Sequence, residues 1–214
     1  MGKLFNLDSP VMQGLSKVAD LVVLNLMTVL LSLPVITAGA ATAALYDAVT
    51  RLLRDEGRLY SSYWNAFRSN FKKATLLWLI VLVAGCLLGL SVLFYLIQET
   101  TGGFLLLLLA GVALFLWAIT AAWIFPLQAR FENTVRGTLH NAVLCALAYL
   151  PRSVAMAVLN LLPLALFLFF PDIFLRIGFV WLSIWYALAA YLNCRILRKP
   201  MEKLMAQAQQ QSEE

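Results

Sequence analysis

Long apolar runs constrain the fold of this chain more than any other feature of its sequence. The four clearest runs cover residues Ala74–Ile97, Phe104–Pro126, Ser153–Phe170 and Ile173–Cys194. A helix crosses the apolar core of a bilayer with about 20 mostly apolar residues, and each run is close to this length. The apolar residues are continuous and do not alternate with polar ones, which favours membrane-spanning helices over the strands of a transmembrane barrel.

The overall composition supports the same fold class. Of the 214 residues, 62% are hydrophobic and 13% are charged, and the mean hydropathy is +0.84. A soluble domain is about 45–50% apolar and about 25% charged, so these values exclude a soluble globular domain and a disordered chain. We therefore predict an all-α, polytopic transmembrane helical bundle that forms one domain over residues 1–200 and ends in a polar tail at 201–214.

The N-terminal third allows two interpretations. Leu21–Leu33 is strongly apolar, Pro34 interrupts it, and a run rich in small residues continues over Val35–Leu52. Proline disrupts the interior of a helix. One long, kinked helix would cross the membrane once and give five spans, whereas a helical hairpin of Lys17–Leu33 and Val35–Leu52 would give six.

The distribution of lysine and arginine separates these interpretations, because cytoplasmic loops carry an excess of both. Six spans place 15 of the 16 Lys and Arg residues on one side of the membrane, and five spans place 13 there. We therefore predict six spans with both termini in the cytoplasm. Basic cytoplasmic loops also account for the net charge of +5. No nucleic-acid-binding motif accompanies this charge, so no nucleic-acid partner is expected.

Two cytoplasmic segments, Tyr60–Lys73 and Asn133–Leu150, have helical periodicity. The first has aromatic residues on one face and cationic residues beside it, a pattern typical of a helix in the lipid headgroup layer. The alternative is a helix packed beneath the bundle. Both segments are the predicted contacts for a partner or for lipid. The residues of this predicted surface are Trp64, Phe67, Arg68, Phe71, Lys72, Lys73 and Arg136.

Polar side chains within the spans form a second set of candidate residues, because such groups are costly in a membrane and usually face a partner or a cavity. Asn25 and Asn160 are predicted near the middle of the bilayer. Asp47 and Arg51 are four residues apart on one helix and are predicted to pair. The alternative role for the polar groups is packing, through hydrogen bonds between helices. The predicted inner-leaflet polar cluster consists of Asp20, Asp47, Arg152, Asn193 and Arg195.

The motifs of common enzyme classes are missing. His140 is the only histidine, and Cys86, Cys145 and Cys194 are isolated from one another, so no metal site is predicted. The sequence has no phosphate-binding loop, dinucleotide fingerprint or zinc-protease motif, and no nucleophile elbow. We expect a protein that is not an enzyme and that needs no cofactor.

Six short sequences spread along the chain are informative together. They are LFNLDSP (Leu4–Pro10), LSKVADLVVLN (Leu15–Asn25), SLPVITAGAATAALY (Ser32–Tyr46), FRSNFKKATLLWL (Phe67–Leu79), FPLQARFENT (Phe125–Thr134) and LPRS (Leu150–Ser153). Their combination resembles the YesL family of uncharacterised bacterial integral membrane proteins, from Leu4 to about Lys199. The resemblance implies a small multi-pass protein of the bacterial cytoplasmic membrane with no established catalytic residues. Family members often occur near sugar ABC-transporter genes, which implies a role beside carbohydrate uptake.

Three functions follow from these observations. The first is a non-enzymatic accessory or permease-like component of carbohydrate uptake, which contacts a transporter subunit through the two cytoplasmic segments. The second is an autonomous small-solute binder or transporter, similar in gross plan to the substrate-binding subunits of energy-coupling-factor transporters. This second function requires a cavity between the spans. The third is a structural module that senses lipid through its basic aromatic surface.

Overall fold

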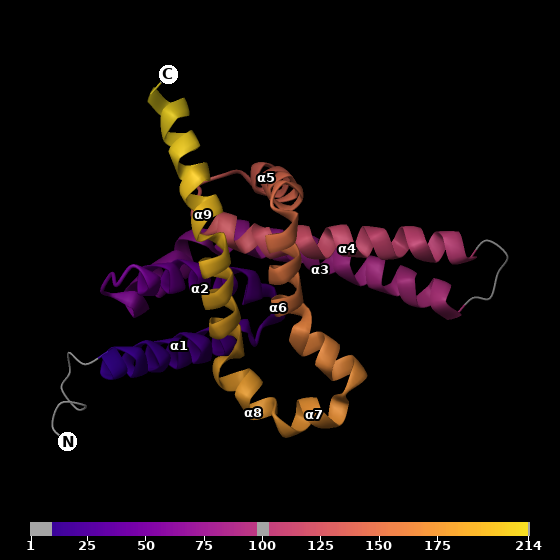
Figure 1. Ribbon diagram of the computed structural model, residues 1–214, viewed down its shortest axis with the longest axis horizontal. Helices are drawn as coiled ribbons and strands as arrows, with labels where there is room; N and C mark the ends of the chain where they lie inside the picture. The colour runs from indigo at the N-terminus through magenta and orange to yellow at the C-terminus, as the bar shows by residue number, and fades with distance from the viewer. Residues whose placement is uncertain (1–9, 98–102, 214) are drawn as a thin grey trace.

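The computed structural model describes residues 10–97 and 103–213, and every regular element in these two ranges is a helix (Figure 1). The predicted all-α helical bundle is therefore confirmed. The sequence LFNLDSP, from Leu4 to Pro10, lies outside the described residues apart from Pro10. The elements are α1 (Pro10–Ser32), η1 (Val35–Thr37), α2 (Ala38–Leu53), α3 (Leu59–Ile97), α4 (Gly103–Gln128), α5 (Val135–Ala148), α6 (Leu150–Phe169), α7 (Pro171–Arg176), α8 (Gly178–Val180), the π-helical turn η2 (Trp181–Trp185) and α9 (Tyr186–Glu213).

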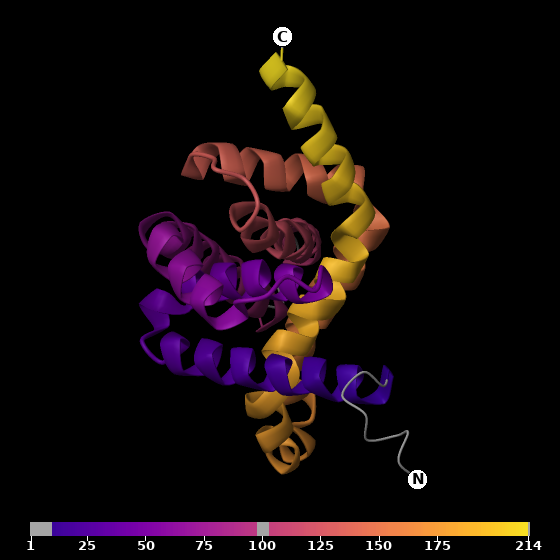
Figure 2. The same cartoon turned by 90° about the vertical axis from the view of Figure 1, so that its left-hand side faces the viewer.

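Five helical segments in the described ranges are long and apolar enough to cross a membrane, which indicates a membrane location. They are α1, α3, α4, α6 and the C-terminal segment Gly178–Ala206, which contains most of α9. These segments are not parallel to one another. In Figure 1, α6 and α9 run across the layer that contains α1 to α4, and Figure 2 shows the same crossing of α9 and α1 from the side.

The N-terminal third forms a hairpin of two helices. α1 ends at Ser32 because Leu33 precedes Pro34, and a residue before proline disfavours the helical conformation. After η1, α2 returns alongside α1, so that Lys17 of α1 forms a 2.7 Å ion pair with Asp55 beyond the end of α2. The hairpin interpretation is thus correct, and a single kinked helix is wrong. Because α2 has 16 residues and lies outside the set of five segments, the sixth crossing stays a prediction.

Small residues place α2 at the centre of the fold. Ten of its residues are buried, half of them alanine, and it packs against α1, α3, α4 and α9. Gly39 marks a close approach to α3, since a β-carbon on Gly39 would collide with the Ala74 carbonyl oxygen and with Cβ of Trp78. Small side chains at such a position let two helix backbones come close together.

α3 joins the first predicted surface helix to the span that follows it. The segments Tyr60–Lys73 and Ala74–Ile97 form one uninterrupted helix of 39 residues, about 58 Å long at 1.5 Å per residue. No proline or glycine separates them, so the backbone has no reason to break there. The first half of α3 packs on α2, whereas the second half forms an antiparallel hairpin with α4 (Figure 1).

The last predicted span, Ile173–Cys194, begins too early: the segment long and apolar enough to cross the membrane is Gly178–Ala206. The chain breaks near Pro171 and Gly178, which begin the short helices α7 and α8. Proline and glycine both favour such interruptions. After the π-helical turn η2, α9 continues to Glu213, so residues 201–213 of the predicted tail are helical.

The contact at Gly39 predicts the outcome of a single substitution. Gly39→Ala should lower the thermal unfolding midpoint in detergent, because forcing an extra methyl group into a packed core costs about 1–3 kcal/mol. Gly89→Ala in α3 is the matched control, since a β-carbon there would meet nothing within 4 Å. Alanine favours a helix over glycine by about 1 kcal/mol, so the control should be unchanged or more stable. Equal destabilisation of both variants would contradict the close approach of α2 and α3.

Candidate functional site

A cavity of about 790 Å³ lies among α1, α2, α3, α4, α6 and α9. Its walls are largely aliphatic and aromatic, and they include Trp78, Trp117 and Trp185. Small-molecule sites in proteins are typically concave and mostly apolar, with volumes of about 300–1,000 Å³ and a few well-placed polar groups. The cavity has this character, and its hydroxyl and amide lining residues are Thr28, Ser32, Thr42, Tyr46, Asn160 and Tyr186.

Four of the polar lining residues are hydroxyl groups that follow helical spacing. Thr28 and Ser32 are one turn apart on α1, and Thr42 and Tyr46 are one turn apart on α2, so each pair lies on one helix face. The Thr28 hydroxyl donates to the Leu24 carbonyl oxygen at 2.8 Å, and the Thr42 hydroxyl donates to the Ala38 carbonyl oxygen at 2.8 Å. A hydroxyl that has used its proton in this way can still accept a hydrogen bond. The Thr42 hydroxyl can therefore accept from a ligand, whereas the Thr28 hydroxyl is buried and also lies 3.1 Å from the Tyr63 hydroxyl.

An amide pair and a tyrosine connect this cavity to the interior. Nδ2 of Asn193 donates to the Tyr46 hydroxyl and to Oδ1 of Asn160, both at 2.9 Å. Asn193 is fully buried, and its Oδ1 atom has no hydrogen-bond partner among the described residues. Leaving a buried polar atom unpaired costs about 1–3 kcal/mol. Asn160 is exposed and lies on the cavity wall. The hydrogen bonds among Tyr46, Asn160 and Asn193 therefore connect the cavity wall to the buried, unpaired Oδ1 atom of Asn193.

Asn25, the other predicted mid-membrane residue, stabilises the irregular start of α9. Its Nδ2 donates to the Leu182 carbonyl oxygen at 2.7 Å, and its Oδ1 accepts from the Ala187 amide at 3.0 Å. An α-helix joins residues four apart, whereas Leu182 and Ala187 are five apart, the spacing of a π-helix. The Asn25 side chain thus provides hydrogen-bond partners for a carbonyl and an amide that are too far apart in sequence to pair with each other in an α-helix. This contact also sets the position of Trp185 and Tyr186, which lie between the two bonded residues and line the cavity.

The five residues of the predicted inner-leaflet cluster have separate partners. Asp20 accepts a hydrogen bond from the Tyr60 hydroxyl at 2.7 Å, and Asn193 belongs to the cluster with Tyr46 and Asn160. The guanidinium groups of Arg152 and Arg195 lie over the rings of Tyr149 and Tyr191, at 5.7 Å and 5.1 Å. Within residues 10–97 and 103–213, no hydrogen bond or ion pair given by the structure joins any two of the five.

Asp47, the fifth of these residues, lies in a charged network outside the cavity. Its carboxylate pairs with Arg51 at 3.0 Å, which confirms the predicted pair, and accepts from the Ser62 hydroxyl at 2.9 Å. Arg51 and Arg54 both also pair with Glu56 in the turn between α2 and α3. Neither Asp20 nor Asp47 lines the cavity, and its described lining contains no charged side chain. The candidate site is therefore uncharged, with a few polar groups in a mostly apolar lining.

Arg130, after the end of α4, lies close enough to this charged network to be affected by it. Burial lowers the pKa of Arg130, and the nearby Arg54 guanidinium lowers it further, whereas Asp47 and Glu56 raise it. The network therefore links the α2–α3 turn to the segment that follows α4. The described residues contain no group of three His, Cys, Asp or Glu side chains that could hold a metal ion.

The predicted partner surface is only partly exposed. Trp64 and Phe71 are exposed, but Phe67 between them is buried, with ring centroids 5.6 Å and 5.5 Å from its two neighbours. The Arg68 guanidinium lies 4.8 Å from the Trp64 ring centroid. Lys72, Lys73 and Arg136 are exposed. One side of this segment thus packs on the bundle, and the other remains available.

The hydroxyl groups of the cavity were missed by reasoning from the sequence. Hydroxyl residues one turn apart near a helical hairpin are a weak signal, and the signal for Tyr46 is weaker still. The aromatic walls come from helices distant in the sequence, so no local pattern reports that they meet. A search for hydroxyl pairs at helical spacing on both arms of the hairpin would have found Thr28, Ser32, Thr42 and Tyr46.

Residues 21–92 match the model of a family described as "Protein of unknown function, DUF624". The match covers most of α1, all of α2 and most of α3, and therefore includes the hairpin that supplies the hydroxyl groups of the cavity. Over these residues the chain is similar to a family of uncharacterised proteins. No curated protein and no solved structure matches the chain.

The bridge made by Asn25 predicts a loss of stability on substitution. Asn25→Leu keeps a similar size but leaves the Leu182 carbonyl and the Ala187 amide without their partner, which should cost about 1–3 kcal/mol. Asn65→Leu on α3 is the matched control, because Asn65 is exposed and surface changes usually stay within about 0.5 kcal/mol. Thermal unfolding in detergent measures both. An Asn25→Leu variant as stable as the control would contradict the bridging role.

Proposed function

We propose that this protein is a non-enzymatic multi-pass membrane protein that binds a small, uncharged amphiphile in the cavity among α1, α2, α3, α4, α6 and α9. The observation that carries this proposal is a cavity of about 790 Å³ with aromatic and aliphatic walls and six hydroxyl or amide side chains. An apolar wall suits the apolar body of a ligand, and a few convergent polar groups fix its orientation. Of the three functions considered, binding of a small solute is the one that requires such a cavity.

The chemistry of the lining supports a ligand with a small polar end. A free sugar presents many hydroxyl groups, and each one buried without a partner carries a desolvation cost. The cavity offers few partners and no charged side chain, which favours an alcohol, ether or amide group over a sugar or an ion. Its described lining also has no Cys, His, Asp, Glu or Lys. A nucleophile next to a general base is the usual requirement for covalent catalysis, so the lining supports binding without a reaction.

The proposed location is the bacterial cytoplasmic membrane, with six crossings and both termini in the cytoplasm. The resemblance to the YesL family supports this location. The distribution of lysine and arginine supports the orientation. The ion pair between Lys17 and Asp55 also supports it, because it places the start of α1 beside the turn between α2 and α3.

Quenching of tryptophan fluorescence tests the proposed ligand class. The probe is an undecanol that carries bromine at its far end, added to the protein in nanodiscs. Three tryptophans line the cavity, so the unaltered protein should show saturable quenching. Thr42→Phe, which fills the cavity, and Asn160→Leu, which removes a polar contact, should each weaken apparent binding by about tenfold, equivalent to about 1.4 kcal/mol. Asn65→Leu is the control and should bind normally. Quenching that is linear in probe concentration and equal in all four proteins would contradict the proposal.

A second candidate function is an accessory role beside a sugar ABC transporter. The observation that favours it is the exposed part of the aromatic and cationic surface, formed by Trp64, Arg68 and Phe71 of α3 with Arg136 of α5. Exposed aromatic residues and arginine are enriched where proteins contact partners. The association with carbohydrate uptake itself comes from the family resemblance.

Co-purification tests this second candidate. In mild detergent, the unaltered protein should retain membrane or ATPase subunits of a sugar transporter. Trp64→Ala combined with Arg68→Glu should lose them, because the change removes an aromatic anchor and reverses a charge. Lys199→Glu, an exposed change on α9, is the control and should retain them. Recovery of the unaltered protein without any transporter subunit would contradict an accessory role.

A further inference from the structure

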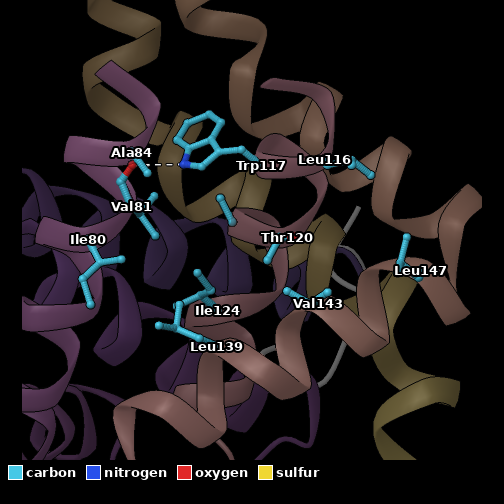
Figure 3. Close-up of a pocket in the computed structure, with 11 residues that line it drawn as sticks. Ile80, Val81, Ala84, Leu116, Trp117, Thr120, Ile124, Leu139, Val143 and Leu147 are labelled. Carbon is cyan, nitrogen blue, oxygen red and sulfur yellow. Dashed lines mark hydrogen bonds between the residues drawn. The ribbon is translucent and has the colours of Figure 1, made fainter. Parts of the chain in front are cut away.

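A second, smaller hollow lies on the surface between α3, α4 and α5. It is a groove of about 370 Å³ whose described lining is apolar apart from Thr120. Figure 3 shows Ile80 of α3, Ile124 of α4, and Leu139 and Val143 of α5 around it. The groove shares Val81, Trp117 and Ala121 with the wall of the larger cavity, and its other eight described lining residues belong to the groove alone.

Side-chain contacts hold the groove open at both walls. The Trp117 indole donates from Nε1 to the Val81 carbonyl oxygen at 3.1 Å (Figure 3). Gly85 leaves room for this ring, since a β-carbon there would collide with it. On the other wall, the Thr138 hydroxyl of α5 donates to Oε1 of Gln128 at 3.2 Å, and Nε2 of Gln128 donates to Oδ1 of Asn70 at 3.0 Å. These bonds fix α5 across α3 and α4, so the groove is preformed.

Helix register puts two cationic residues on the faces that line the groove, because Lys73 lies two turns before Ile80 on α3 and Arg136 lies one turn before Leu139 on α5. Because Thr138 is linked through Gln128 to Asn70, the first turn of α5 lies near that part of α3. Arg136 is in this first turn, and Lys73 is one turn beyond Asn70, towards Ile80. Both cationic residues are exposed. Glu132 is the only acidic residue in α3 or in residues 129–150, so this end of the groove is strongly cationic.

We propose that the groove binds one anionic phospholipid of the surrounding bilayer. An acyl chain occupies the apolar groove, and the phosphate lies between Lys73 and Arg136. The groove is at the boundary between an apolar helix pair and a basic segment, which is where a headgroup meets its chains in a membrane. Charge complementarity selects an anionic lipid over a zwitterionic one, because basic residues near the membrane surface attract anionic lipids by about 1 kcal/mol each.

Native mass spectrometry of the detergent-solubilised full-length protein tests this proposal with phosphatidylglycerol and phosphatidylcholine as probes. The unaltered protein should retain one phosphatidylglycerol at least tenfold more strongly than one phosphatidylcholine. Lys73→Gln combined with Arg136→Gln should abolish this preference. Arg198→Gln combined with Lys199→Gln removes two exposed charges from α9 and should preserve it. Equal retention of both lipids by the unaltered protein would overturn the proposal.

A size variant separates the groove from simple surface attraction. Val143→Trp places a large side chain in the groove and should reduce phosphatidylglycerol retention about tenfold. Leu144→Trp is the matched control, because Leu144 is equally exposed on α5 but does not line the groove, and it should retain the lipid. Both variants alter exposed residues, and an unchanged thermal unfolding midpoint confirms that each is folded. Loss of lipid from the charge variant with full retention by Val143→Trp would overturn the role of the groove.

Discussion

The close packing of the small-residue helix α2 against α3 is the interaction on which the rest of the structure depends. Because alanine and glycine line its buried face, α1, α3 and α9 can all approach its backbone. Gly39 sets the closest of these approaches. The same arrangement brings Thr42 and Tyr46 to the inner face of the hairpin, where the larger helices do not fill the space. The cavity is therefore a consequence of one short, tightly packed helix surrounded by long ones.

The membrane setting explains why the buried polar groups are amides and hydroxyls. In hydrocarbon every backbone polar group needs a partner within the protein, and Asn25 supplies one where α9 departs from regular helical spacing. Asn193 connects Tyr46 to Asn160 without introducing a charge. Four carboxylates, by contrast, pair with basic or hydroxyl side chains near the turn that follows α2, namely those of Asp20, Asp47, Asp55 and Glu56. This separation leaves a neutral polar patch inside the bundle and a charged network at its edge.

The fold class follows from the sequence because long apolar runs have few alternatives to membrane-spanning helices. The hairpin also follows, since Pro34 and the basic residues both favour it. Two features depend on contacts that no local pattern reports. The turn η2 exists where Asn25, more than 150 residues away, bridges α9. The cavity forms where helices distant in sequence meet, so its hydroxyl groups have no collective signal. The expected cluster around Asp20 failed to appear as a bonded group because depth in the membrane does not specify which helices are neighbours.

Function is proposed for an accessible, mostly apolar cavity among the spans, with Asn160 on its wall. The most direct test of this proposal is the rate at which a charged methanethiosulfonate reagent modifies a thiol placed there. In a variant without the native cysteines, Asn160→Cys is compared in native membranes with Val158→Cys, an exposed position on the same helix that does not line the cavity. The account predicts modification at least tenfold faster for Asn160→Cys. Equally slow modification of both variants would show that the site is closed to water and would contradict the account.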